Sequence, residues 1–423
     1  MSNKVQSYKT LLLFVFALYV YLGKGVAYSY LAELTWLLGI ILLINERKNT
    51  FILKSFRSVL LIFLLFINLL FIIRGFIKYS ILDVLRDSFI LNYIFFAFII
   101  FLFYDNITDF LKQIIKVYKY YPLILSLLYL LSLNHFLGNI TIFGSNHLLY
   151  FKYGDIAVHL YISLILQLTG YFNLTKKESI INLGFILFLF VIASSYSRGG
   201  MLAFLLALII FIFNNRDKAL KTNMKGYVKY IFLSFLIILP LVLVLPSDEN
   251  FQGRKTGLDQ IGNNVTSIVS DDDQGTLSDN KVWRLLWWAK IVDYTFGGDY
   301  FFTGKGLGMS LAQDDDIIFE SGDADLRSPH NFHLSILARY GVPIFFLWIF
   351  WLIISFIRLR DKSITNLKLI LITIQIAFIF NASFDVFLEG PMGAFPFWIF
   401  VGIDFINEAY NLDKTIPKQA LIA

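Results

Sequence analysis

The sequence has 423 residues, of which 57% are hydrophobic and 16% are charged, and its mean hydropathy is +0.69. A charged fraction this far below the roughly 25% of soluble domains indicates a polytopic membrane protein and excludes a soluble globular one. The chain contains no cysteine, which excludes disulfides, thiol catalysis and thiolate metal sites, and its formal net charge is +6. The basic residues concentrate in short segments between apolar runs, where membrane topology explains them, so no nucleic-acid partner is expected.

Apolar runs of roughly 17 to 25 residues, the length that a bilayer core requires, predict an all-α membrane protein with about twelve transmembrane helices. We expect these helices at about 10–24, 27–45, 57–73, 88–104, 119–136, 154–172, 178–195, 199–214, 228–246, 342–357, 367–385 and 392–408. The first run follows Lys4 and Lys9 and could be mistaken for a secretory signal. It is expected to be a true span, because no small-residue cleavage site follows it and further spans do.

Lysine and arginine are unevenly divided between alternate loops. Most of them fall in the termini and in one set of loops, which the positive-inside rule assigns to the cytoplasm. The short loops of the other side carry only Lys24, Arg74, Lys78, Arg86, Lys152 and Arg198. We therefore expect cytoplasmic termini and three parts: helices one to nine in 1–246, a large outward loop with amphipathic helices in 247–341, and three helices with a cytoplasmic tail in 342–423.

The outward segment 247–330 is rich in acidic residues, including the triplets at 271–273 and 314–316. Clustered carboxylates could hold a divalent cation. Neither triplet has the alternating ligand spacing and turn glycine of a calcium loop, so a solvated acidic surface is the favoured interpretation.

The stretch SDNKVWRLLWWAKIVDYTF, residues 278–296, predicts a helix capped by Ser278 or Asp279. Arg284, Trp288 and Ile291 fall on one face of it. Its tryptophans suggest a helix that lies in the membrane interface, with the arginine at headgroup depth.

The stretch DLRSPHNFHLSILARYGVPIFF, residues 325–346, carries the candidate catalytic base. Ser328 is expected to cap a helix, Pro329 to be its first residue and His330 to lie in its first turn, with Gly341 and Pro343 ending it. The positive end of the helix dipole disfavours imidazolium, and neutral imidazole is the form that a general base needs. The alternative is that His330 is simply a polar residue at the entrance of a membrane helix.

Outward arginines at span ends are candidate anion-binding residues. Arg198 precedes Gly199 and Gly200, which allow close approach of the backbone, and its guanidinium can bind phosphate oxygens in a bidentate manner. Arg284 is a second such residue, and Arg74 and Arg86 belong to a further outward cluster. Arginines that reach toward lipid headgroups, or that simply flank a span, are the alternatives.

Late in the chain, NASFDVFLEG places Asp385 and Glu389 in the last outward turn. One of them could orient the His330 ring or contact a sugar, although solvated turn carboxylates are the favoured interpretation. Within the expected spans ionisable residues are nearly absent apart from Glu33, Asp155 and His159, which argues against a secondary transporter.

Four stretches resemble the O-antigen ligase and polymerase superfamily of bacterial membrane glycosyltransferases. They are SYSRGGMLAF at 195–204, the Arg284 helix with FTGKGLGMSL at 302–311, SPHNFHLSILARYGVP at 328–343 and NASFDVFLEGPMGAFPFW at 381–398. The resemblance covers roughly 180–400, and the His-Asn pair with the following Leu-rich turn and Gly is its most specific part. Many members have a second Gly where this chain has Pro343 and Ile344, which puts only the local turn in doubt.

The resemblance implies a twelve-span glycosyltransferase of the type C kind in the bacterial inner membrane. It would act on the periplasmic face with an undecaprenyl-pyrophosphate-linked glycan as donor, and with neither metal nor other cofactor. It also implies that Arg198 and Arg284 bind the donor pyrophosphate and that His330 activates the acceptor hydroxyl. Asn331, the residue after His330, can hydrogen-bond locally or to a sugar of the substrate, and it is counted among the candidate substrate-binding residues.

The acceptor distinguishes two activities that share this chemistry. A polymerase transfers to another lipid-linked repeat unit, whereas a ligase transfers to lipid A core. The acidic outward loop disfavours an acceptor as anionic as phosphorylated core, and the composition resembles products of O-antigen gene clusters, so polymerase is the lead prediction. A lipid-oligosaccharide flippase and a noncatalytic scaffold are the competing classes, and other polysaccharide-assembly proteins are candidate partners.

Overall fold

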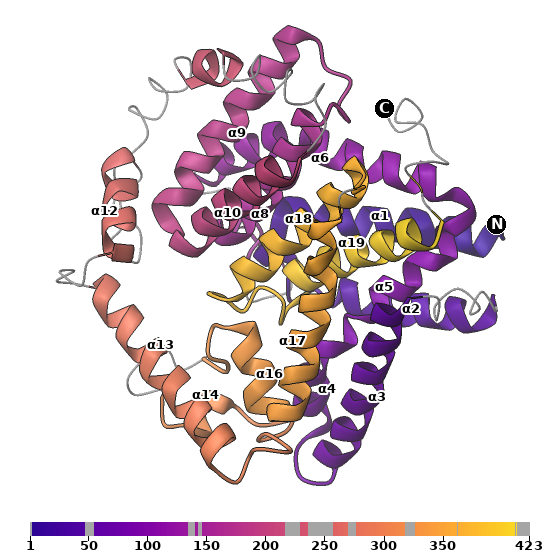
Figure 1. Cartoon of the computed structure of the whole chain (residues 1–423), viewed down its shortest axis with the longest axis vertical. Coiled ribbons are helices and arrows are strands. Elements are labelled where there is room, and N and C mark those ends of the chain that lie inside the picture. Colours follow the sequence, from indigo (N-terminus) through magenta and orange to yellow (C-terminus); the bar gives the residue numbers. More distant parts are fainter. Residues whose placement is uncertain are drawn as a thin grey trace.

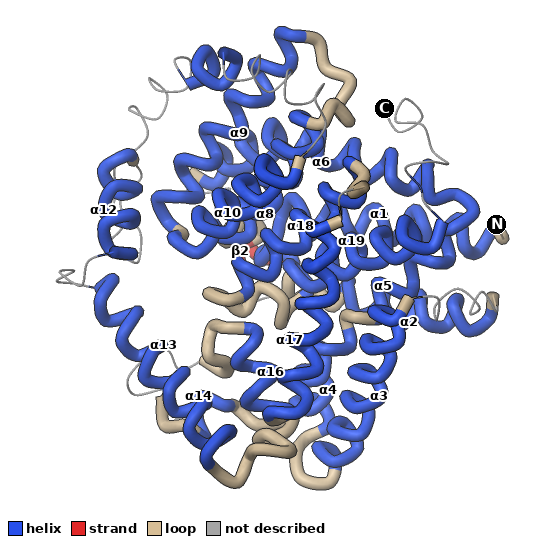
Figure 2. The backbone as a smooth tube through the Cα atoms, viewed as in Figure 1, coloured by secondary structure: helices blue, strands red, loops and turns tan. Residues whose placement is uncertain are grey.

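The computed structural model describes residues 2–46, 55–133, 140–142, 146–215, 229–235, 257–269, 276–317, 326–361, 363–410 and 412. This part of the chain is almost entirely helical (Figure 2). Its strands are β1 (Thr141–Ile142) and β2 (Asn146–His147), which pair antiparallel. The predicted helical fold class is confirmed.

The helices up to the outward loop are α1 (Asn3–Leu22), η1 (Gly23–Val26), α2 (Leu31–Asn45), α3 (Phe56–Phe76), α4 (Ile81–Asn92), α5 (Phe95–Ile99), η3 (Ile100–Asn106), α6 (Ile107–Ser132), α8 (Tyr153–Leu168), α9 (Lys176–Tyr196) and α10 (Arg198–Asn214). The later helices are α12 (Leu258–Val269), α13 (Thr276–Val292), η4 (Asp293–Gly297), α14 (Leu311–Asp314), α16 (Phe332–Tyr340), α17 (Val342–Phe356), η5 (Ile357–Arg360), α18 (Asn366–Ala382) and α19 (Pro391–Tyr410).

Five helical stretches of the described chain are long and apolar enough to cross a membrane: Asn3–Val26, Phe56–Phe76, Phe95–Ser132, Lys176–Tyr196 and Val342–Arg360. Shorter apolar helices occur at Leu31–Asn45, Tyr153–Leu168, Arg198–Asn214 and Asn366–Ala382. Helix is present at the other expected spans too, but of 228–246 only 229–235 is described. The protein therefore has several membrane-spanning helices, while the count of twelve stays a prediction.

The sequence predicts a loop at 105–118, between the fourth and fifth spans, but the structure has helix there. α5, the 3-10 helix η3 and α6 follow one another directly from Phe95 to Ser132, with non-helical backbone angles at Asn106 (φ −124°, ψ 28°). The lysines of α6 break its apolar run, but Ile107, Phe110, Ile114 and Tyr118 recur at helical spacing and are buried. A window that counts only apolar residues cannot detect a helix that continues as an amphipathic one.

The centre of the molecule is built from α8, α18 and α19. Nearly every residue of these helices is buried, as expected for helices that are apolar all round. α8 also packs closely on α10, because a Cβ on Gly200 would lie 2.6 Å from the Cα of Gly154. The glycines thus bring the N-terminal ends of α8 and α10 together, which positions Arg198 beside the end of α18.

The part of the outward segment that contains α13 and α14 packs against α16 and α17 at the lower end of the view in Figure 1, whereas α12 lies apart from them and contacts α9. Trp283, Trp287 and Ile291 of α13 form a hydrophobic cluster with Leu337 of α16 and Val342 of α17. Two tryptophans of α13 therefore pack on the helix that follows His330. The sequence instead predicts that the tryptophans of α13 lie in the membrane interface. The outer face of α13 carries Leu285 and Leu286, which are half-exposed.

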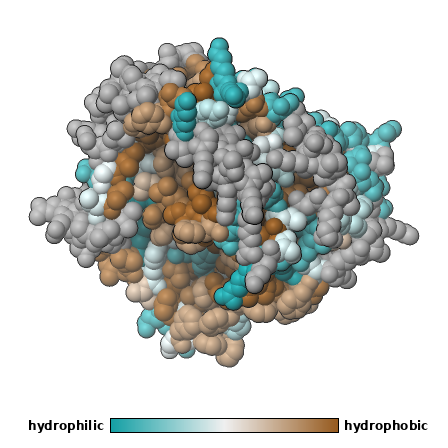
Figure 3. Space-filling model, turned by 45° about the horizontal axis from the view of Figure 1, so that its top comes forward, coloured by the Kyte–Doolittle hydropathy of each residue, from teal (hydrophilic) through white to brown (hydrophobic). Residues whose placement is uncertain are grey.

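Large apolar side chains are exposed on many helices, as expected where helices contact lipid. Ile77 is 84% exposed and Phe213 is 82% exposed. The face drawn in Figure 3 carries broad apolar patches between hydrophilic side chains. Such patches on a soluble protein would be an aggregation hazard, but in a bilayer they are the contact surface.

A buried ionic cluster lies among the apolar helices and corrects the expectation that the spans are nearly free of charge. Asp404 of α19 is bound by Arg57 Nη1 at 2.9 Å and by both terminal nitrogens of Arg358 at 2.6 and 2.8 Å. The Arg57 and Asp404 side chains are 4% and 0% exposed. The scarcity of ionisable residues within the spans was the argument against a secondary transporter, and this buried cluster weakens it.

The second acidic triplet is less solvated than predicted. Asp315 is buried, and it accepts hydrogen bonds from Lys305 Nζ at 2.6 Å and from Trp287 Nε1 at 2.7 Å. Lys305 also binds Asp314. The charge of this part of the loop is therefore partly neutralised internally. The triplet at 271–273 lies outside the described residues.

Candidate functional site

His330 lies just before α16, and the predicted helix start is wrong. Asn331 is the N-cap, and its Oδ1 accepts hydrogen bonds from the backbone N–H groups of His333 at 3.0 Å and Leu334 at 3.2 Å. Asparagine is a stronger cap than the Ser-Pro pair that the sequence suggested, because here it satisfies two orphan donors. Asn331 thus has a structural role, and its expected substrate contact stays a prediction.

The backbone of His330 adopts a left-handed conformation, with φ of +53°. This conformation is uncommon for a residue other than glycine and is found preferentially at functional sites. Since His330 lies outside the first turn, the helix-dipole argument for a neutral ring does not hold in its predicted form. The side chain is 27% exposed.

Arg284 reaches the His330 ring from α13. Its Nη2 lies 3.4 Å from His330 Nδ1, and its Nη1 donates to the carbonyl oxygen of Phe384 at 3.4 Å. Trp288, one turn later, donates from Nε1 to the carbonyl oxygen of Pro329 at 2.7 Å. The Trp283 ring meets the imidazole edge-on, with centroids 6.0 Å apart. α13 therefore holds both the backbone and the ring of the His330 segment.

Arg198 is the first residue of α10, whose N-cap is Ser197. The next residue, Gly199, packs against the same turn that Arg284 contacts, since a Cβ there would lie 2.9 Å from the Cβ of Phe384. Burial lowers the pKa of Arg284, Asp385 opposes that shift and Arg198 adds to it. The two arginines thus share one neighbourhood and repel each other, an arrangement that an anion between them would relieve.

Asp385 lies beside the ring, with its Oδ1 3.9 Å from His330 Nδ1. The same oxygen accepts from Lys152 Nζ at 2.5 Å and from the Val386 N–H at 2.7 Å. Burial raises the pKa of Asp385, but Lys152 and His330 outweigh it, so the net shift is downward and the carboxylate stays ionised. The favoured interpretation of a solvated turn carboxylate is wrong for Asp385, whose side chain is only 19% exposed.

Glu389 is also engaged, but with α16. Its Oε1 accepts from Ser335 Oγ at 2.6 Å, and burial raises the pKa of its carboxyl group, with Ser335 and Ser328 opposing. Glu389 therefore fixes the helix behind His330. The favoured interpretation of a solvated turn carboxylate is wrong for Glu389 as well.

His333 is directed into the protein. Trp348 Nε1 donates to its Nδ1 at 3.0 Å, and its Nε2 lies 3.1 Å from Ser383 Oγ. Burial lowers the pKa of His333 to about 4. Because Nδ1 must accept from Trp348, the proton of the neutral ring is on Nε2, and both nitrogens are used structurally.

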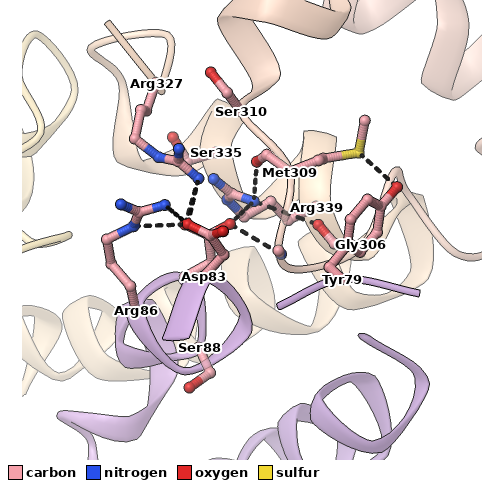
Figure 4. A network of polar contacts seen from close by, with 12 residues as sticks. Tyr79, Asp83, Arg86, Ser88, Gly306, Met309, Ser310, Arg327, Ser335 and Arg339 are labelled. Carbon is pink, nitrogen blue, oxygen red and sulfur yellow. Dashed lines mark hydrogen bonds and ion pairs between the residues drawn. The ribbon is translucent and has the colours of Figure 1, made fainter. Parts of the chain in front are cut away.

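Arg86 belongs to a separate charge network that joins α4 to α16. Figure 4 shows Arg86, Arg327 and Arg339 turned toward a common acidic centre that includes Asp83. Asp87, at that centre, accepts from Arg339 Nη1 at 2.8 Å and lies 3.8 Å from Arg86 Nε and 3.6 Å from Arg327 Nη2. Arg86 therefore anchors α4 and does not reach the His330 ring in the described contacts.

Arg74 is exposed and lies over the ring of Phe71, with the Cζ atom 5.9 Å from the centroid. This is the arrangement of a flanking charge at a helix end. Its expected contribution to the site stays a prediction that no described contact supports.

Lys152 and Phe384 contribute to the site but were not singled out from the sequence. Lys152 could have been, because it is one of the few basic residues on the outward side and lies at the start of an apolar helix, the same criterion that identified Arg198. Phe384 contributes through its carbonyl oxygen, which no sequence pattern reveals.

The site thus contains two mutually repelling guanidinium groups, a partly buried imidazole and an ionised carboxylate paired with a lysine. Guanidinium groups bind phosphate oxygens and stabilise charge that develops on a leaving diphosphate. An imidazole with a carboxylate partner can take a proton from a hydroxyl group. These groups together suit transfer from a diphosphate donor to an alcohol.

Comparison with known proteins gives one family match. Residues 183–349 match the family model described as O-antigen ligase. The matched range includes Arg198, Arg284 and His330 and ends before Asp385. No curated protein matches the sequence.

Proposed function

Since the chain belongs to the O-antigen ligase and polymerase superfamily, whose family domain occupies 183–349, we propose that it transfers a glycan from an undecaprenyl-pyrophosphate carrier to a sugar hydroxyl on the periplasmic side of the inner membrane. The family and the apolar helices make it a multi-pass bacterial membrane protein of glycosyltransferase type. The donor, the membrane side and the acceptor are the proposed parts. Both termini face the cytoplasm in this proposal.

The observation that carries the proposal is that Arg284 and His330 lie beside the turn that holds Phe384 and Asp385. Arg284, His330 and this turn are far apart in the sequence. Arg284 bonds the Phe384 carbonyl, His330 lies 3.9 Å from Asp385, and Gly199, next to Arg198, packs on Phe384. A noncatalytic scaffold would not need this juxtaposition. A flippase would need a basic path open to both sides, whereas these groups gather in one place.

In the proposed step, Arg198 and Arg284 bind the diphosphate of the donor. The acceptor hydroxyl oxygen attacks the anomeric carbon and the bond from that carbon to the diphosphate oxygen breaks. The hydroxyl proton goes to His330, and the lipid diphosphate leaves with the electron pair of the broken bond. Asp385 stabilises the imidazolium that forms.

Polymerase is the lead activity, with a lipid-linked repeat unit as acceptor, and ligase onto lipid A core is the alternative. The composition of the chain supports the polymerase. The internal pairing of Asp314 and Asp315 with Lys305 weakens the argument from an acidic outward surface, and the description of the family supports the ligase.

The test is an assay with purified protein and a purified lipid-linked repeat unit, with and without core lipid. We expect glycans of two or more repeat units on the lipid carrier, and release of lipid diphosphate, without core lipid. Product only when core lipid is present would identify a ligase. If neither mixture gives transfer, while labelled donor appears in the opposite leaflet of proteoliposomes, the protein is a flippase.

A further inference from the structure

One nitrogen of His330 has two competing partners. Its Nδ1 lies 3.4 Å from Arg284 Nη2 and 3.9 Å from Asp385 Oδ1. A guanidinium group can only donate hydrogen bonds and an ionised carboxylate can only accept them. A neutral ring can therefore satisfy one of these partners at a time, and the choice decides which nitrogen carries the proton.

The two tautomers differ in their ability to act as a base. If Nδ1 accepts from Arg284, the ring proton is on Nε2 and the remaining lone pair faces a cation. If Nδ1 carries the proton and the ring moves from its 3.9 Å separation to donate a hydrogen bond to Asp385 Oδ1, Nε2 has the lone pair and the carboxylate stabilises the imidazolium formed on protonation. Only the second tautomer suits proton abstraction by Nε2, since a carboxylate at the far nitrogen fixes the productive form.

We propose that Lys152 is a positioning residue that holds Asp385 for His330, and that the donor diphosphate switches His330 to its basic tautomer by drawing Arg284 away from Nδ1. This inference rests on the proposed function and adds the order of its first two events, donor binding and then formation of the base. The base is formed only after the donor is bound, so an acceptor hydroxyl is not deprotonated in an empty site.

Lys152 is suited to this role because it binds the very oxygen that faces the ring. Its Nζ lies 2.5 Å from Asp385 Oδ1, and the Lys152 and Asp385 side chains are 20% and 19% exposed. Lys152 immediately precedes α8, whose contact with α10 is fixed by Gly154 and Gly200. A backbone N–H from Val386 also binds Oδ1, so the carboxylate does not follow Arg284 when that arginine moves.

Arg284 is suited to act as the mobile partner. Both of its contacts, to Nδ1 and to the Phe384 carbonyl, are at 3.4 Å, the long limit of a hydrogen bond. Its Nε is buried without a hydrogen-bond partner in the described chain. A diphosphate offers this guanidinium shorter, charge-assisted bonds, so exchange of partners is favourable.

The experiment uses full-length protein with ¹⁵N-labelled histidine in nanodiscs, and inorganic diphosphate as the probe. The chain has five histidines, and the His330 signals are identified by their loss in His330→Gln. Without diphosphate we expect a protonated Nε2 and an unprotonated Nδ1. Saturating diphosphate should reverse this assignment. A bound diphosphate that leaves the tautomer unchanged would overturn the switch but not the proposed function.

Lys152→Met tests the positioning role. We expect a fall in kcat of about 10–100-fold, as is typical for loss of an outer-shell partner, with little change in the KM for donor and with loss of the tautomer reversal. Lys152→Arg should restore both. The matched control is Lys24→Met, which removes another outward lysine, one that lies over the Tyr150 ring at 4.6 Å, and it should change neither property.

If Lys152→Arg fails to rescue, or if KM rises as much as kcat falls, Lys152 is only structural. Failure of the proposed function is distinct: wild-type protein would give no transfer at all.

Discussion

Arg339, near the end of α16, donates from Nη1 to Asp87 of α4 at 2.8 Å, although these residues lie in opposite halves of the chain. Both side chains are nearly fully buried, at 4% and 5% exposure. Asp87 also accepts from the Gly308 N–H at 3.0 Å. The helix that follows His330 is thereby held at its far end by an ion pair with the N-terminal half of the protein.

Asp87→Asn should therefore destabilise the protein by about 3–5 kcal/mol, because it leaves the Arg339 guanidinium buried without a counter-charge. The measurement is unfolding in detergent followed by tryptophan fluorescence. The matched control is Arg86→Gln, which removes a half-exposed member of the same network and should cost no more than about 1 kcal/mol. Equal effects of the two variants would contradict the assignment of the buried pair.

His330→Ala should reduce turnover by about 10²–10⁴-fold, the usual contribution of general-base assistance. Binding of the lipid-linked donor should persist, because the arginines hold the diphosphate. Turnover and donor binding are measured separately on purified protein. Full activity of His330→Ala would show that the proton is taken elsewhere.

Arg284→Lys and Arg198→Lys retain the charge but lose the planar fork that binds two oxygens. We expect a large loss of donor affinity and activity with normal membrane insertion. Isothermal titration with the lipid-linked donor and membrane fractionation measure the two properties. Unchanged affinity in both variants would assign these arginines to lipid headgroups.

His333 should make the free energy of unfolding depend on pH. Burial lowers its pKa to about 4, so between its unfolded value of about 6.5 and 4 only the unfolded chain takes up the proton. Stability is therefore complete above about pH 6.5, falls as pH drops through this window and loses up to roughly 3 kcal/mol. His333→Gln, which cannot titrate, should lack this part of the pH dependence. Parallel unfolding curves for the two proteins from pH 7 to pH 4 would refute the buried neutral ring.

The predicted topology places 247–330 outside and both termini in the cytoplasm. Reporter fusions at residue 250 and after Ala423 should report the periplasm and the cytoplasm, respectively. Cytoplasmic activity at residue 250 would remove the basis for a periplasmic active site.

The sequence was sufficient for the helical membrane class and for naming three residues of the candidate site, whose roles stay predictions. Long apolar runs force helices, because a bilayer leaves no other partner for backbone polar groups. Arg198, Arg284 and His330 were identifiable because charged or ionisable groups at the ends of apolar helices are few. The residues Asn331 and Ser328 show the limit: both are good caps by composition, and only packing decided that the helix begins after Asn331.

The tertiary structure alone decided which charges meet. Asp385 and Glu389 look equivalent in sequence, but Asp385 pairs with Lys152 beside His330, whereas Glu389 binds Ser335 of α16. Arg86 and Arg284 are both outward arginines, but Arg86 is held by Asp83 and Asp87, and Arg284 reaches the imidazole. Helix periodicity fixes only the face on which a side chain lies. Its partner depends on how helices distant in sequence pack, and here that packing is set by close contacts such as Gly154 against Gly200.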